Sequence, residues 1–111
     1  MNISIYAKNI ELTGAIRSYV EDKISSLTKF IRPSSIGVSE AKVEIGKPSE
    51  RHKTGPVFYA EVNLKVGGEI LRATAKQADL YAAVDEIREE LENQIKKNKE
   101  KRIDARRKST K

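Results

Sequence analysis

Apolar residues in the first third of the chain follow two different periods. A strand is predicted over 2–8, because apolar residues there alternate with polar ones, namely Ile3, Ile5 and Ala7. The next apolar residues are three or four positions apart and predict a helix over 13–31: Ile16, Val20, Ile24, Leu27 and Ile31. Thr13 is a suitable N-cap for this helix, and Pro33 ends it. The Ser- and Gly-containing segment 33–39 is predicted to be a loop.

Three further strands are predicted in the middle of the chain, over 41–45, 58–66 and 69–75. Gly67-Gly68 between the last two strands is typical of a two-residue hairpin turn. This turn determines the expected pairs, which are Val66 with Glu69, Leu64 with Leu71, Val62 with Ala73, and Ala60 with Ala75. The polar, Gly- and Pro-rich segment 46–56 predicts a long loop between the second and third strands.

The last predicted element is a helix with Asp79 as its N-cap. Its apolar stripe continues over four turns: Leu80, Val84, Ile87, Leu91 and Ile95. The next positions of the stripe hold Asn98 and Arg102, so we expect the core to end near Ile95. Beyond that point the helix should extend from the body as a charged rod that frays at 109–111.

These elements predict an α+β fold with the order β-α-β-β-β-α. One face of the predicted hairpin is apolar, whereas the other is mixed and largely polar: Asn63, Lys65, Ile70, Arg72 and Thr74. A face of this composition is expected to contact solvent, so both helices should lie on the other face. The predicted architecture is a two-layer sandwich, a four-stranded sheet with two helices on one face.

The composition excludes several classes of function. A chain of 111 residues forms a single core, and this one has no Cys and one His. Nucleophilic triads and Cys- or His-based metal sites therefore lack their usual residues, and His52 has no partner at metal-ligand spacing. We predict neither an enzyme nor a cofactor or metal site. The chain has no run of about 18 apolar residues and no signal-peptide pattern, which predicts a cytoplasmic protein without membrane contact.

The formal net charge of +6 is concentrated at one end of the sequence. Residues 96–111 hold nine basic and two acidic side chains, whereas residues 1–95 hold 13 basic and 14 acidic ones. We therefore divide the domain into a folded body, 1–95, and a basic helical extension with a flexible tail, 96–111. A near-neutral body with a cationic segment is typical of nucleic-acid binding. A basic tail that only complements the helix dipole is the alternative interpretation.

Helical geometry divides the basic residues near this extension between two flanks of the apolar stripe. Lys97 and Lys101 lie on one flank, and Arg88 and Lys99 lie on the other. Lys23 lies at the margin of the first helix's stripe, where its stem can pack while its ammonium group reaches solvent. If the helices lie side by side, Lys23 can line one groove with Lys97 or Lys101.

Aromatic residues make up 5% of the chain, and none are paired on a predicted exposed strand face. Tyr59 is predicted to be the one aromatic residue on such a face, and Tyr81 is interpreted as structural. This pattern favours recognition of the phosphates and shape of folded RNA over the stacking of single-stranded bases.

Several segments of the chain are distinctive. The most specific is 79–85 (DLYAAVD), followed by Leu91, Gln94 and 96–101 (KKNKEK); near the start they are 2–6, 12–17 and Lys23. In these segments, and over its whole length, the chain resembles the ribosome hibernation-promoting factor and ribosome-associated inhibitor family, also known as sigma-54 modulation proteins. The resemblance implies a fold similar to double-stranded RNA-binding domains. The chain looks like a short form, although an N-terminal domain cut from a long form would look the same.

The resemblance also implies a partner, the small ribosomal subunit, bound in the channel where mRNA and tRNA sit. We expect competition with both RNAs, and a monomer off the ribosome. By carry-over, the candidate rRNA contacts are Arg17, Lys23, Lys96, Lys97, Lys99, Lys101, Arg102, Arg106 and Arg107.

Two functions from different classes follow from these observations. The first is a non-enzymatic translation inhibitor that occupies the decoding channel and keeps idle ribosomes inactive under stress. The second is a regulator of transcription, a sigma factor modulator, that acts by protein interaction and uses the basic tail as a ligand for an acidic partner. An RNA-modifying enzyme lacks any catalytic constellation in this sequence.

Overall fold

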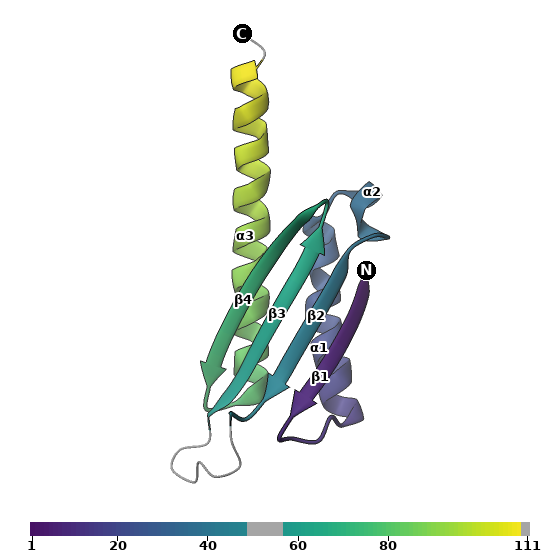
Figure 1. Cartoon of the computed structure of the whole chain (residues 1–111), viewed down its shortest axis with the longest axis vertical. Helices are drawn as coiled ribbons and strands as arrows, with labels where there is room; N and C mark the ends of the chain where they lie inside the picture. Colours follow the sequence, from purple (N-terminus) through teal and green to yellow (C-terminus); the bar gives the residue numbers. More distant parts are fainter. Residues whose placement is uncertain (49–56, 110–111) are drawn as a thin grey trace.

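The structure is a computed structural model that describes residues 1–48 and 57–109, with side chains through Lys99. The predicted loop residue His52 therefore lies outside the described residues. The elements, drawn in Figure 1, are β1 (Asn2–Lys8), α1 (Gly14–Ser25), the 3-10 helix η1 (Ser26–Phe30), α2 (Pro33–Ile36), β2 (Glu40–Gly46), β3 (Phe58–Val66), β4 (Glu69–Gln77) and α3 (Leu80–Ser109).

The four strands form one sheet in the order β1-β2-β3-β4. β1 is parallel to β2, and the other two pairs are antiparallel. The predicted register of the β3–β4 hairpin is confirmed in all four expected pairs. Gly67 and Gly68 have φ angles of 55° and 84°, the left-handed backbone that a tight two-residue turn requires and that glycine adopts without strain. β4 extends beyond the predicted end at Ala75 because Gln77 still pairs with Phe58.

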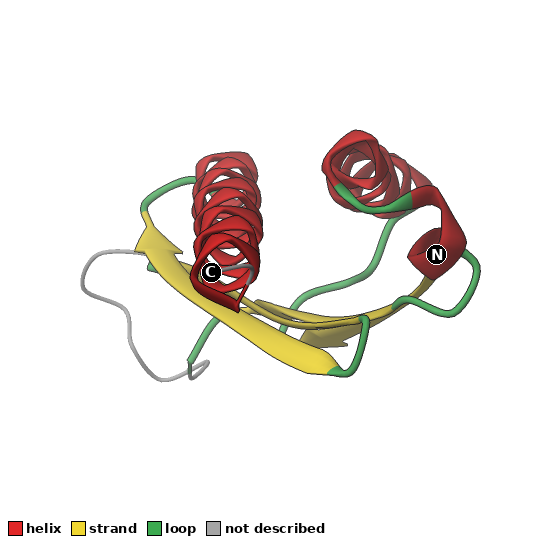
Figure 2. Cartoon of the chain, turned by 90° about the horizontal axis from the view of Figure 1, so that it is seen from above, coloured by secondary structure: helices red, strands yellow, loops and turns green. Residues whose placement is uncertain are grey.

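Both long helices cover the same face of the sheet, as predicted (Figure 2). The core between the two layers contains the predicted stripes of both helices and the inward residues of the strands; its fully buried members include Val20, Ile24, Leu27, Ile45, Leu64, Ile87 and Leu91. The predicted solvent face of the hairpin is exposed, and Ile70 on it keeps 67% of its surface accessible. The expected α+β two-layer sandwich is therefore confirmed.

The prediction of one helix over 13–31 was wrong over 26–31. Thr13 caps α1 by accepting a hydrogen bond from the Ile16 amide at 3.2 Å, but the α-helix ends at Ser25 and continues as η1. Side-chain hydroxyls explain the change, because Ser26 and Thr28 donate to carbonyl oxygens three residues earlier, at 2.6 and 2.8 Å. Such local bonds compete with α-helical geometry and favour a tighter turn.

The predicted loop over 33–39 contains a short helix, α2. Pro33 occupies its first turn, where the fixed φ of proline favours a helix and its missing N–H group costs nothing. α2 lies at the end of the sheet where β3 turns into β4 (Figure 1), and residues of η1 line the same groove as residues of α2 and the hairpin.

α3 extends far beyond the sheet (Figure 1). Ile95 is the last buried residue among the described side chains of α3, as predicted, and the helix then continues to Ser109. The molecule consequently measures 60 × 25 × 17 Å, with a radius of gyration of 16.0 Å rather than the ~13 Å of a compact chain of this length. Within the described parts of the chain, no helix is both long enough and apolar enough to cross a membrane.

Candidate nucleic-acid interface

α1 and α3 lie side by side on the sheet and begin at the same end of it (Figures 1 and 2). A cluster of polar contacts joins them near that end. The Tyr19 hydroxyl donates a hydrogen bond to Oδ1 of Asp85 at 2.5 Å, and the rings of Tyr19 and Tyr81 meet edge to face with centroids 4.6 Å apart. Tyr81 therefore contributes to helix packing, in agreement with its structural interpretation.

The candidate residue Lys23 forms an ion pair with the same Asp85 carboxylate. Nζ of Lys23 lies 3.3 Å from Oδ1 of Asp85 and 5.4 Å from the centre of the Tyr19 ring. The hydrogen bond to Asp85, together with burial, raises the pKa of Tyr19 to about 12, because ionising the phenol would place a second negative charge beside the carboxylate. Lys23 thus has a partner within the protein, whereas half-exposed Arg17 has only a looser pair with Glu21 at 3.8 Å.

A second cluster joins α3 to η1 around the ring of Phe30. Three cationic groups lie within 6 Å of the ring centre: Lys96 at 5.0 Å, Lys29 at 5.2 Å and Arg88 at 5.9 Å. Arg88 donates to the Ser26 hydroxyl at 3.0 Å and pairs with Glu92 at 2.7 Å. Lys96 and Arg88 hold the pKa of Glu92 below its usual value, since both donate hydrogen bonds to it. The aromatic ring and one carboxylate therefore hold several cations close together.

The predicted groove that Lys23 would share with Lys97 is not formed. The flank of α3 that faces η1 carries Arg88 and Lys96, and Lys97 is exposed on a different side of the helix. Lys97 also lies 12 positions after the Asp85 partner of Lys23, which corresponds to ~18 Å along the helix. The side chain of Lys101 lies outside the described residues.

The structure divides the candidate residues into three groups along the helical layer. Arg17 and Lys23 lie on α1, and Lys96, Lys97 and Lys99 lie on α3 just after the last buried residue. The others belong to the projecting part of α3, where only the backbone is described: Lys101, Arg102, Arg106 and Arg107. Their contacts with rRNA stay a prediction.

Sequence reasoning missed Phe30 and Lys29 as members of the basic surface. The predicted α-helix over 13–31 included Phe30, whereas Phe30 belongs to the 3-10 helix η1, and its ring lies beside Lys96 of α3. The run of hydroxyl residues at 25, 26 and 28 was the available signal for that change.

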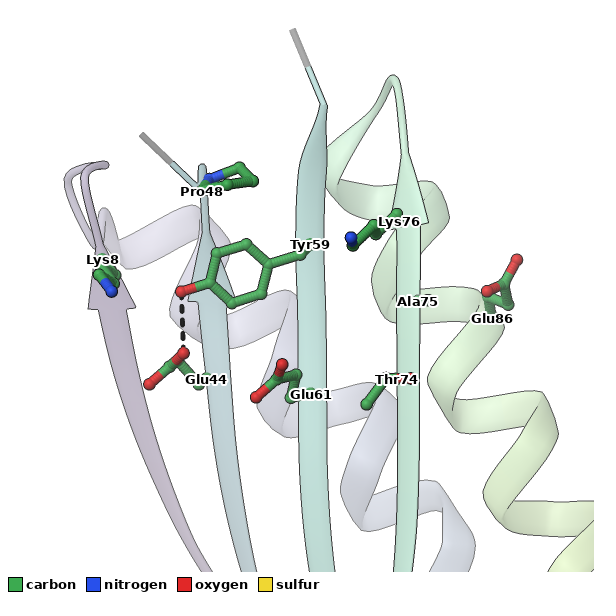
Figure 3. Close-up of a pocket in the computed structure, with 9 residues that line it drawn as sticks. All are labelled: Lys8, Glu44, Pro48, Tyr59, Glu61, Thr74, Ala75, Lys76 and Glu86. Atoms are coloured by element: carbon green, nitrogen blue, oxygen red, sulfur yellow. Dashed lines mark hydrogen bonds between the residues drawn. The ribbon is translucent and has the colours of Figure 1, made fainter. Parts of the chain in front are cut away.

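The prediction that Tyr59 is exposed was wrong. On the open face of the sheet, its ring extends over β2 and its hydroxyl donates to Glu44 at 2.8 Å, which leaves 8% of the residue accessible (Figure 3). Burial and this hydrogen bond raise the pKa of Tyr59 to about 12. The surrounding cavity of about 540 Å³ contains Glu44, Glu61 and Glu86 beside two lysines, a mixture that does not favour a phosphate. The aromatic residue exposed on this face is Tyr6, at 61%.

Fold and charge together define a class of protein: a small α+β domain whose helical layer carries a cationic surface continued by a projecting basic helix. The chain belongs to the family described as sigma 54 modulation protein / S30EA ribosomal protein, whose model matches residues 3–103. This match confirms the family resemblance drawn from the sequence.

Relatives and solved structures agree with this assignment. The chain is 34% identical over 99 residues to the ribosome hibernation promotion factor of Lactococcus lactis, and 35% identical over 92 residues to that of Deinococcus radiodurans. These alignments cover 89% and 83% of this chain but 50% and 46% of the relatives, so the chain spans about half of their length.

Two solved structures share the fold. The N-terminal domain of Protein Y from Thermus thermophilus aligns with a TM-score of 0.74 and 34% identity, over 87% of this chain and 98% of that domain. A ribosomal subunit interface protein from Coxiella burnetii aligns with a TM-score of 0.70 over 89% of this chain and 98% of that one. At 24% identity, the second likeness concerns the fold alone.

Proposed function

We propose that this protein is a non-enzymatic ribosome hibernation factor of the cytoplasm that binds the small ribosomal subunit in its mRNA and tRNA channel. The observation that carries the proposal is the basic α3 helix, which leaves the core after Ile95 and continues to Ser109. The chain that carries this helix belongs to the S30EA ribosomal protein family. The names of the Lactococcus and Deinococcus relatives support a role in hibernation. Inhibition then results from occupancy of the channel.

The proposed contacts are electrostatic. Lys97 and Lys99 are exposed on α3, and half-exposed Arg17 lies on α1 on the same helical layer. Phosphates are contacted by such side chains without dependence on base identity, and each contact releases counterions from the RNA. Lys23 must break its ion pair with Asp85 before it can contact a phosphate. The free-energy cost of breaking this pair reduces the contribution of Lys23 to the affinity.

Regulation of transcription through protein interaction is the alternative function, and the family description includes sigma 54 modulation. The two functions differ in partner: the first requires the small subunit and its rRNA, and the second requires a protein. Binding to purified small subunits without other factors therefore separates them.

The test is co-sedimentation with purified small subunits over a series of salt concentrations. If about six phosphates are neutralised, the slope of log affinity against log salt should be roughly −4 to −5. A variant with Lys42 and Lys65 of the open sheet face changed to Gln serves as the charge control, and it should keep the same slope. No binding at low salt would reject ribosome binding, and a slope near zero would reject the phosphate contacts.

A further inference from the structure

A groove of about 700 Å³ lies at the end of the body from which α3 projects. It is lined by residues of η1, α2, the β3–β4 hairpin and α3, and its apolar lining includes Phe30, Ile31, Ile36, Val66, Leu71 and Ile95. Four of these side chains are only partly buried, namely those of Phe30, Ile36, Val66 and Leu71. The volume is within the range of ~300–1,000 Å³ typical of binding sites. The core therefore continues into an open apolar surface at this end.

The rim of this groove is mainly cationic. Lys29, Arg32 and Lys99 belong to its lining, and Lys96 lies beside it on the Phe30 ring. Among the described residues of the lining, Glu69 is the one carboxylate, and it accepts a hydrogen bond from Asn98 at 2.7 Å. A ligand for this groove should thus combine an apolar surface with negative charge, since an apolar floor and a basic rim complement both.

The aliphatic character of the floor favours a protein over an RNA. Unpaired bases are held mainly by stacking on aromatic rings or guanidinium planes, whereas the floor, as far as the structure describes it, contributes one aromatic ring, Phe30, which already has three cationic neighbours. Isoleucine, valine and leucine side chains are typical contacts for aliphatic residues of a peptide.

A second copy of this chain does not match the groove. The acidic face of α3 would be the natural candidate, but it carries exposed Glu86, Glu89 and Glu90 without an exposed aliphatic residue beside them in the described part of the helix. The hairpin contributes the side chains of Val66, Glu69 and Leu71 to this groove, although β4 is an edge strand of the sheet. A groove lined by side chains from several elements suits a helix laid into it.

We propose that this groove is a docking site for an acidic amphipathic helix of a partner protein. Two or three aliphatic side chains of that helix occupy the floor between α2 and α3. Its carboxylates meet Lys29, Arg32 and Lys99 on the rim. This interaction goes beyond RNA binding, and of the proposed rRNA contacts the groove lining includes Lys99.

The test uses nuclear magnetic resonance of the full ¹⁵N-labelled chain with a synthetic helical peptide of about 16 residues. The peptide contains Glu and Ala with Leu at positions spaced three and four apart, and a matched peptide has Gln in place of each Leu. We expect saturable shifts of the Phe30, Val66, Leu71 and Asn98 amides with the Leu peptide. The Gln peptide should bind at least tenfold more weakly, because the apolar contacts are lost.

Two pairs of variants locate the site. Lys99→Glu should weaken binding of the Leu peptide severalfold, whereas Lys97→Glu, an equal charge change two positions away, should have a clearly smaller effect on this peptide. Ile36→Ser in the groove should weaken it, and Ile70→Ser on the opposite sheet face should not. The lysine pair keeps the test valid if Ile36→Ser is unstable.

Three results would overturn the proposal. The first is equal binding of the Leu and Gln peptides, or no saturable shift with the Leu peptide. The second is displacement of the Leu peptide from the groove amides by a uridine hexamer, which would assign the groove to RNA. The third is concentration-dependent dimerisation of the free chain with shifts of the same amides, which would assign it to a second copy. None of these results depends on ribosome binding, so failure here is distinguishable from failure of the proposed function.

Discussion

At the scale of single residues, the Asp85 carboxylate has two tasks in the contact between the long helices. It accepts the hydrogen bond of the Tyr19 hydroxyl and pairs with Lys23 on the next turn of α1. Both contacts are partly exposed, so each stabilises the fold modestly. Their larger effect is on the two partner side chains, because Asp85 raises the pKa of Tyr19 and pairs with Lys23, a candidate rRNA contact.

Replacing Asp85 by Asn should lower the pKa of Tyr19 from about 12 toward 10. The stabilisation from this hydrogen bond is fully present below pH 10 and is lost as the pH rises from about 10 to about 12, because the folded-state pKa is the higher one. Ultraviolet absorbance titration at the phenolate band checks this. The variant is best compared in a Tyr59→Phe background, which removes the other tyrosine with a pKa of about 12. An unchanged titration curve in Asp85→Asn would contradict this account.

At the scale of elements, α3 changes its function along its length. Its first half is a core helix: Asp79 caps it by accepting from the Tyr81 amide at 3.2 Å, and the buried stripe continues to Ile95. After Lys96 the described side chains are exposed or half-buried. Residues needed for folding and residues proposed for binding therefore follow one another on the same helix. The division of the chain into 1–95 and 96–111 stays a prediction.

The triple change of Lys97, Lys99 and Lys101 to Glu should weaken binding to small subunits by orders of magnitude while leaving the melting temperature within a few degrees. Exposed substitutions typically change the free energy of unfolding by less than about 0.5 kcal/mol each. Leu91→Ala is the opposite case, since it truncates a fully buried side chain and should cost about 2 to 5 kcal/mol. Thermal unfolding and co-sedimentation of both variants measure the two effects. If the triple variant unfolds, these lysines are structural.

At the scale of the whole molecule, a narrow body carries a long cationic projection, and the overall length is 60 Å. Residues 96–111, with nine basic and two acidic side chains, account for the whole net charge of +6, and the rest of the chain is close to neutral. Such an asymmetric distribution orients a protein as it approaches a polyanion. In the proposed function, the body beside this projection obstructs the RNA channel.

Occupancy of the channel predicts competition with mRNA and initiator tRNA on the same small subunit. Each should lower the apparent affinity of the other, and inhibition should be stoichiometric with ribosomes and reversed by dilution or high salt. A displacement titration on purified small subunits, followed by chemical footprinting of the rRNA, measures this. Unchanged binding at saturating mRNA and tRNA, with protections outside the decoding channel, would reject occupancy even if the protein binds ribosomes.

The sequence by itself determined the strands, the hairpin register, the two-layer arrangement and the point at which the core ends. These features depend on local periodicity and on turn geometry: Gly67-Gly68 allowed a single register, and the stripe from Leu80 to Ile95 could be buried on one side only. The family was also recognisable, because the segment 79–85 is distinctive.

Only the tertiary structure decided which side chains meet. The burial of Tyr59 depends on Glu44 of a neighbouring strand, and the need for Gly46 arises because any Cβ there would lie 2.0 Å from the Lys8 carbonyl oxygen of β1. The pairing of Lys23 with Asp85 and the cations around Phe30 join residues about 60 positions apart in the chain. Periodicity reports which face of an element is buried, but not which residue of another element lies opposite it. That choice follows from how the helices are placed on the sheet.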